Sequence, residues 1–345
     1  MHKRKTPQAR YTFALAGNPN VGKSTVFNAL TGMHQHTGNW AGKTVSCAKG
    51  SYTFENESYS LTDLPGTYSL LARSAEEEVA RDFICFAQTQ GTVVVCDGTA
   101  LERNLNLVLQ ILEVTDRVLV CVNLLDEAKR KHISINLPLL EEKLGVPVVG
   151  VVAKQKRSLY RLKEKIAALP TQKSTPCKTK YPLQVEAALE KIISCLERKP
   201  LGKLSLRFVA LRLLEGNESF LASLTAFAGQ DFLDEGLKET LETQKKALSL
   251  CGYDERRLCD EIASAHVKKA EAIAKEAVAC IAKRSDAFDR KLDGIFTHRL
   301  LAYPFMALLF ALVFYITVVG ANTPSDWLSR HLFAFGAWGQ EKLLS

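Results

Sequence analysis

The sequence predicts an α/β domain with a mostly parallel sheet, followed by an all-helical domain and one membrane-spanning helix. Three observations support this class. Over residues 11–169, short apolar runs alternate with helical patterns, which is typical of a parallel sheet covered by helices on both faces. Residues 183–287 show only helical periodicity. Residues 300–321 contain no charged side chain, and about 20 apolar residues span the hydrocarbon layer of a bilayer.

The amino-acid composition excludes few kinds of protein. A chain of 345 residues has room for two or three domains. The 45 basic and 37 acidic residues give a net charge of +8, which suits anionic lipid, nucleic acid or ordinary solubility equally well. Nine cysteines show neither a C-x-x-C pair nor zinc spacing, which indicates buried thiols in a reducing compartment. The N-terminus lacks the apolar core of a secretory signal.

The first predicted strand and helix flank a glycine-rich loop. Residues 11–16 are typical of a short buried strand, and residues 25–30 of the first turns of a helix. The loop between them fits G-x-x-x-x-G-K-[ST], whose backbone N–H groups converge on phosphate oxygens at the positive end of the helix. Lys23 is expected to reach the outer phosphates, and Ser24 to bind magnesium. The nucleotide-binding residues predicted here are Gly17, Asn18, Pro19, Asn20, Val21, Gly22, Lys23, Ser24 and Thr25.

Residues 33–43 are rich in glycine and polar side chains and lack periodicity, which predicts a long functional loop. Thr44 closes it, and its hydroxyl can reach the metal only when a third phosphate is present, as in the order–disorder switch of GTPases. His34 and His36 have no carboxylate neighbour, so we interpret them as polar loop residues rather than a metal site. The nucleotide-binding residues predicted in and after this loop are Gly42, Lys43, Thr44, Val45 and Ser46.

A hairpin follows the loop. Residues 45–54 and 58–62 are predicted strands joined across residues 55–57. The second strand runs into D-L-P-G, where Asp63 offers a carboxylate to the magnesium shell and Gly66 an N–H to the terminal phosphate. The predicted site residues of this segment are Asp63, Leu64, Pro65 and Gly66, and the predicted magnesium ligands are Ser24, Thr44 and Asp63.

The rest of the α/β domain alternates helices with apolar strands and carries a base-recognition pattern. Asn123-Leu124-Leu125-Asp126 fits N-x-x-D directly after a buried strand. The Asp126 carboxylate can accept hydrogen bonds from N1 and N2 of guanine, a pair that adenine does not offer. A helix N-cap role would explain Asp126 alone, but not three motifs at strand ends, where such sheets bind ligands. The predicted helices are 75–86, 101–112, 137–144 and 158–169, and the predicted strands 92–96, 117–122 and 146–152.

The second half divides into a linker, helices and the apolar span. Predicted helices are 183–196, 204–214, 219–227, 233–250 and 255–283, after a linker at 170–181. We therefore expect a nucleotide-binding domain at 1–170, a helical regulatory domain at 171–285, and a juxtamembrane segment with a first membrane helix (299–321) at 286–345. Basic residues just before the span place the N-terminal part in the cytoplasm: Arg290, Lys291, His298 and Arg299. A buried core helix is the alternative, although core helices usually keep a polar face.

Several runs resemble one family, the bacterial ferrous iron transporter FeoB. They are the phosphate loop, G-N-W-A-G-K-T-V at 38–45, D-L-P-G-T-Y-S-L at 63–70, E-R-N-L at 102–105 and T-H-R-L at 297–300. The resemblance covers essentially the whole chain, and the run before Thr44 is its most specific part. It implies a P-loop GTPase domain, a helical domain that regulates nucleotide dissociation, and a multi-span Fe(II)-conducting region in the bacterial cytoplasmic (inner) membrane.

The resemblance also implies cofactors, site residues and partners. GTP and GDP are the expected nucleotides, with Mg²⁺ and a K⁺ ion at Asn20 that accelerates hydrolysis. The expected catalytic residues are Lys23, Thr44, Gly66 and Asn20, and Thr67 stands where Ras-like proteins have a water-orienting glutamine, so intrinsic hydrolysis should be slow. Val152-Ala153-Lys154 matches the guanine-facing loop, with valine where the family often has serine. Expected partners are Fe(II) as the transported ion, the lipid bilayer, small accessory Feo proteins and a second copy of the chain.

Other readings differ in what the nucleotide switch controls. A membrane-anchored regulatory GTPase outside any ion path is the main alternative. An RNA-assembly GTPase would need a basic and aromatic binding module, which residues 183–283 lack, so no nucleic-acid partner is expected. Asn123 and Asp126 argue against an ATP-dependent transporter. Because one helix cannot enclose an ion path, we expect either an N-terminal fragment, the simpler reading, or a pore completed by other chains.

Overall fold

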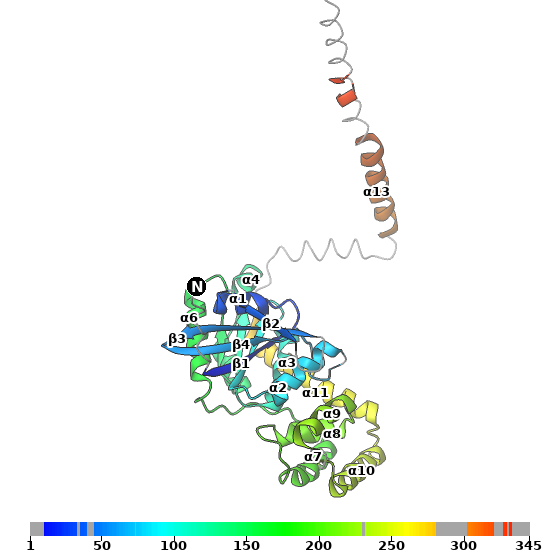
Figure 1. Ribbon diagram of the computed structural model, residues 1–345. Helices are drawn as coiled ribbons and strands as arrows, with labels where there is room; N and C mark the ends of the chain where they lie inside the picture. Colours follow the sequence, from blue (N-terminus) through cyan, green and yellow to red (C-terminus); the bar gives the residue numbers. More distant parts are fainter. Residues whose placement is uncertain are drawn as a thin grey trace, which may run out of the picture. The chain divides into compact units, whose positions relative to one another are not determined.

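The computed structural model describes residues 10–32, 35–39, 45–72, 74–229, 232–280, 302–320, 327–329 and 331–332. The chain divides into two compact units, Met1–Ile281 and Ala282–Ser345 (Figure 1).

A seven-stranded sheet in the order β2-β3-β4-β1-β5-β6-β8 lies in the first unit (Figure 1). Neighbours from β4 through β8 pair in parallel, whereas β3 is antiparallel to both β2 and β4. The sheet is therefore mostly parallel, as predicted. Its strands are β1 (Tyr11–Gly17), β2 (Gln35–Asn39), β3 (Ser46–Phe54), β4 (Glu57–Asp63), β5 (Gly91–Asp97), β6 (Val118–Asn123) and β8 (Val148–Gly150).

Both faces of the sheet are buried under helices. Along β5, Val93 and Val95 belong to one hydrophobic core and Val94 and Cys96 to the other, and all four are fully buried. Helices α1 and α6 pack in the first core, which contains Val93 and Val95. Helices α2, α3 and α5 pack in the second core, which contains Val94 and Cys96. Near-continuous apolar strands need helices on both faces, because both sets of side chains must be buried. The helices are α1 (Lys23–Thr31), α2 (Ala75–Phe86), α3 (Leu101–Val114), α4 (Leu125–Arg130), α5 (Leu137–Leu144) and α6 (Lys156–Ala168).

The second core continues into a group of helices at one end of this unit (Figure 1). Polar caps begin four of these helices: the side chains of Ser205, Asn217, Asp234 and Asp254 each accept a hydrogen bond from the backbone N–H three residues later. Each cap stabilises its helix by about 1 kcal/mol. The helices are α7 (Leu183–Leu196), α8 (Leu206–Leu214), α9 (Glu218–Ala228), α10 (Glu235–Leu250) and α11 (Glu255–Ala277).

Two predicted segments differ from the structure. Part of the predicted loop at 33–43 is strand β2, whose backbone pairs with β3 although its glycine and polar residues carry no strand signal. The predicted helix at 255–283 ends at Ala277, because Val278–Cys280 forms β9 and pairs antiparallel with β7 (Ile133–Ile135). The two errors have different causes. Strand β9 forms by pairing with a segment distant in the sequence, which periodicity does not report, whereas β2 pairs with the next strand along the chain but has no apolar residue to indicate a strand.

The described part of the second unit contains α13 (Ala302–Tyr315) and a π-helical turn, η2 (Ile316–Gly320). Within the described residues, no helix has both the length and the apolar character needed to cross a bilayer. The ends of the predicted span at 299–321, residues 299–301 and 321, lie outside the described residues. The span therefore stays a prediction.

Candidate nucleotide site

The phosphate loop joins β1 to α1, and its two glycines are required for different reasons. Gly22 has a φ of +76°, and a Cβ there would lie 2.5 Å from Nδ2 of Asn123. Gly17 is extended, but a Cβ there would lie 2.5 Å from the carbonyl oxygen of Val95 on β5. One glycine thus allows a left-handed turn, and the other allows close contact with the sheet.

The start of α1 has free backbone donors. Gly22 is its N-cap and provides no side-chain hydrogen bond, so the first N–H groups of the helix remain available for an anion. The Lys23 ammonium is ion-paired with Asp63 at the end of β4, and the Ser24 hydroxyl donates to the other carboxylate oxygen of Asp63 at 3.1 Å. Hydroxyl and carboxylate oxygens are the ligands that Mg²⁺ prefers, so Ser24 and Asp63 fit the predicted metal.

The D-L-P-G segment lies directly on the phosphate loop. A Cβ on Gly66 would be 3.1 Å from Cα of Pro19, and the Thr67 backbone N–H donates to the Gly17 carbonyl at 3.2 Å. The Thr67 side chain is buried and donates to the Ser69 carbonyl at 2.7 Å, with Glu77 Oε1 at 3.2 Å. Its hydroxyl is therefore held by its own loop and by α2 rather than turned toward the phosphate loop.

A cavity of about 530 Å³ opens beside these groups. One of its lining residues, Glu76, was not identified from the sequence. Glu76 lies in the first turn of α2, where acidic residues are common because they favour the positive end of the helix, so no motif distinguishes it. The residues lining the cavity are Asn18, Pro19, Asn20, Gly22, Lys23, Ser24, Thr25, Gly66 and Glu76.

The N-x-x-D segment reaches the same loop from β6. Asn123 is buried, and its Nδ2 donates to the Val21 carbonyl at 3.1 Å. Leu124 takes a φ of +60°, which turns the chain into α4 and places the exposed Asp126 in the first turn of that helix. Asn123 thus fixes the phosphate loop, while the Asp126 carboxylate remains accessible to a ligand.

The segment Val152-Ala153-Lys154 follows β8, the neighbour of β6 in the sheet. Ser158 of α6 holds this segment: its Oγ accepts from the Val152 N–H at 3.2 Å and donates to the Val152 carbonyl at 2.8 Å. Sequence reasoning did not identify Ser158, which follows Val152 by six residues in the sequence. It supplies a hydroxyl contact to the backbone of Val152.

Some predicted site residues cannot be placed. Gly42, Lys43 and Thr44 lie outside the described residues, as does His34. Val45 packs against the second core, and Ser46 begins β3. Over the part of the chain that is described, no three His, Cys, Asp or Glu side chains cluster in a way that could hold a metal ion.

A glycine-rich loop between β1 and α1, with D-x-x-G packed on it from the end of β4 and N-x-x-D from the end of β6, defines a P-loop GTPase of the α/β class. The family described as ferrous iron transport protein B matches residues 11–166, and the FeoB cytosolic helical domain matches residues 181–279. The chain belongs to the FeoB family.

Relatives agree with this assignment. The cytosolic domain of the T. maritima FeoB iron transporter in a GDP form is 33% identical, with a TM-score of 0.65; the match covers 79% of this chain and all of that structure. The Fe(2+) transporter FeoB of Staphylococcus aureus strain MSSA476 is 29% identical over 94% of this chain. The Fe(2+) transport protein A/FeoB fusion protein of Porphyromonas gingivalis is 31% identical over 91%. This chain spans 46% and 38% of the lengths of these last two proteins.

These findings confirm the predicted family, the GTPase domain and the helical domain that follows it. They also confirm a guanine nucleotide as the ligand class of the family's GTPase domain, since solved relatives hold GDP.

Proposed function

We propose that this chain is the GTP-binding and GTP-hydrolysing cytoplasmic part of an Fe(II) transporter of the bacterial cytoplasmic membrane, in which the GTP state controls ferrous iron uptake. One observation carries the proposal. The phosphate loop, the Asp63–Gly66 segment and Asn123 meet at the carboxyl ends of β1, β4 and β6, in a chain that belongs to the FeoB family.

Phosphate binding is assigned to the loop and the start of α1. The free N–H groups of α1 hold the phosphate oxygens, and Lys23 exchanges its Asp63 partner for the outer phosphates. Ser24, Asp63 and Thr44 hold Mg²⁺, which neutralises charge on the phosphates when bound. Asn20, exposed on the loop at a φ of +64°, holds K⁺.

Hydrolysis transfers the γ-phosphoryl group to water: the bond to the bridging oxygen breaks, and a bond to the water oxygen forms. The Gly66 N–H stabilises the terminal phosphate as its charge redistributes. The Thr67 hydroxyl is held by the Ser69 carbonyl and Glu77, so it does not orient the water in this arrangement. A slow intrinsic rate follows.

Guanine recognition is assigned to the ends of β6 and β8. The Asp126 carboxylate accepts from N1 and N2 of the base, and the Ala153 N–H, held in place through Val152 and Ser158, donates to its carbonyl. We assign residues 1–170 to the GTPase domain, 171–285 to the helical regulatory domain and 286–345 to the juxtamembrane segment, with 299–321 as a first membrane helix. Accessory Feo proteins and a second copy of the chain are the proposed partners.

Two measurements test the proposal separately. Calorimetry of the purified chain with Mg²⁺ should show GDP bound at least about a hundredfold more tightly than ADP, because adenine leaves the Asp126 carboxylate unpaired. Equal affinities would overturn the nucleotide assignment. Radioactive Fe(II) uptake by cells that carry Lys23→Ala in the complete gene should fall to the level of a deletion, at an unchanged amount of protein in the membrane. Normal uptake would instead support a GTPase switch outside the ion path.

A further inference from the structure

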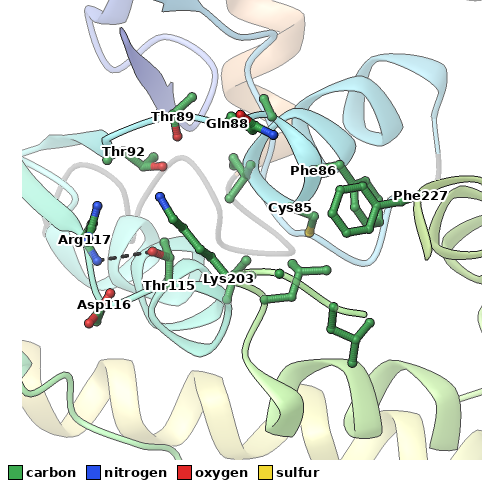
Figure 2. A pocket seen from close by; sticks show the side chains of 17 residues that line it. Cys85, Phe86, Gln88, Thr89, Thr92, Thr115, Asp116, Arg117, Lys203 and Phe227 are labelled. Atoms are coloured by element: carbon green, nitrogen blue, oxygen red, sulfur yellow. Dashed lines mark hydrogen bonds between the residues drawn. The ribbon is translucent and has the colours of Figure 1, made fainter. Parts of the chain in front are cut away.

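A second cavity of about 560 Å³ (Figure 2) lies at the amino ends of β5 and β6, whereas the nucleotide site lies at the carboxyl ends of β1, β4 and β6. It is formed where α2 ends, where β5 and β6 begin, and by the 201–204 loop and Phe227 of the helical group. Strand β5 is seven residues long, about 20 Å, so this cavity is separate from the phosphate loop. Its volume lies within the range of roughly 300–1,000 Å³ that small-molecule sites occupy.

One side of the cavity is basic. Lys203 extends across it with its ammonium toward Thr92 and Arg117 (Figure 2). Neither Lys203 nor Arg117 makes an ion pair with another described residue. Asp116 is the one carboxylate among the described lining residues, so the lining keeps a net positive charge. Two unpaired cations that face one cavity favour an anionic group between them.

The other side is apolar and partly open. The rings of Phe86 and Phe227 lie 5.1 Å apart between centroids, and Phe227 remains 43% exposed. Cys85 lies beside them, and burial raises the pKa of its thiol to about 12, so this wall carries no charge at neutral pH. An exposed aromatic surface next to cationic groups suits a molecule with an apolar body and a charged end.

We propose that this cavity binds a small organic anion, a phosphate or carboxylate that carries an aromatic or aliphatic body. The anionic group lies between Arg117 and Lys203, and the body lies on Phe86 and Phe227. Because the ligand contacts both α2 and the 201–204 loop, its binding stabilises the packing of the α/β part against the helical group. The site is distinct from the nucleotide site, and the proposal does not depend on iron transport.

Calorimetry with the purified chain, saturated with GDP and Mg²⁺ to occupy the nucleotide site, tests the ligand class. The probes are 1-naphthyl phosphate, 1-naphthoate, neutral 1-naphthol and inorganic phosphate. At least one naphthyl anion should bind at one site, about tenfold or more tightly than both 1-naphthol and inorganic phosphate, and the tighter of the two anions identifies the charged group. Equal binding of 1-naphthol, or of phosphate alone, would overturn the proposal.

Variants locate the site. Lys203→Ala and Arg117→Ala should each weaken binding of the preferred anion about tenfold, and Ala87→Trp, which fills the cavity, should abolish it. Lys246→Ala is the matched control, because Lys246 is an exposed lysine on α10 that does not line the cavity. This variant should bind the preferred anion with the same affinity as the parent chain. Should Ala87→Trp fail to fold, the surface substitution Lys203→Glu decides instead. Equal affinities in Lys203→Ala, Lys203→Glu and Lys246→Ala would contradict the site.

Discussion

Two regions of the first unit use ion pairs in opposite ways. In the nucleotide site, Lys23 and Asp63 pair beside a cavity, and their side chains keep about a tenth of their surface exposed. In the helical group, Arg207 of α8 lies between Glu113 of α3 and Glu186 of α7 and also donates to the Thr179 carbonyl. The first pair can exchange partners for a ligand, whereas the charges of the second set pair with each other and join the two parts of the fold.

The two regions differ in what holds their charged side chains in place. Lys23 and Asp63 are brought together by backbone constraints, namely the glycine turn and the parallel pairing of β1 with β4. Arg207 is held by its partners, and burial raises the pKa of Glu113 despite the nearby guanidinium. Removing a side chain from the first region should therefore change binding, and removing one from the second should change stability. Four substitutions distinguish these two outcomes.

Asp126→Asn should weaken GTP binding about a thousandfold and shift preference toward xanthosine triphosphate, because the amide cannot accept both guanine donors. The unfolding midpoint should stay within about 1 °C of the parent, since Asp126 is exposed. Calorimetry with both nucleotides measures the shift. Glu127→Gln, the neighbouring acidic residue on α4, serves as the control, and an unchanged nucleotide ranking in Asp126→Asn would contradict the assignment.

Arg207→Ala should destabilise the chain by about 3 kcal/mol, because it leaves the buried Glu113 carboxylate without its cation. GDP affinity should change less than about threefold, since Arg207 lies outside the nucleotide site. Urea unfolding monitored by circular dichroism measures the loss. Arg256→Ala, an exposed arginine on α11, should cost less than about 0.5 kcal/mol. An equally small loss for Arg207→Ala would show that these charges do not stabilise the packing of α3 against α7 and α8.

His266 on α11 should make stability depend on pH. Burial lowers the pKa of His266 from 6.5 to about 4, so the unfolded chain binds the extra proton between these values. The stabilisation is present above pH 6.5 and is lost as pH falls toward 4, by about 2 kcal/mol between pH 7 and pH 5. His266→Gln should flatten this part of the profile in urea unfolding at several pH values. A variant with the same slope as the parent would exclude His266 as its source.

Asn20→Ala should remove potassium stimulation of GTP hydrolysis, an effect of about tenfold in rate, while GDP affinity stays within about threefold. Phosphate release in potassium and in sodium buffers measures it, and Asn56→Ala, another left-handed asparagine in the β3–β4 turn, is the matched control. Equal rates of the parent chain in the two salts would end the potassium proposal.

Sequence reasoning located the helices with strong caps and clear periodicity. The bounds of α2, α5 and α7 agree with the predicted ranges, and Ser74 and Asn136 cap the first two. It failed for β7 and β9, which depend on each other across a long stretch of sequence, and for β2, whose residues carry no apolar strand pattern. The contributions of Glu76 and Ser158 were missed for a related reason: each reaches the site from the first turn of a helix that carries no motif.

The sequence by itself determined the fold class, the phosphate loop and the nucleotide class, because short motifs impose their own backbone geometry at the ends of apolar strands. Only the tertiary structure decided which charges remain available to ligands and which neutralise each other. That distinction depends on packing between α3, α7 and α8 and on the cavities left beside them, and neither is encoded in local spacing.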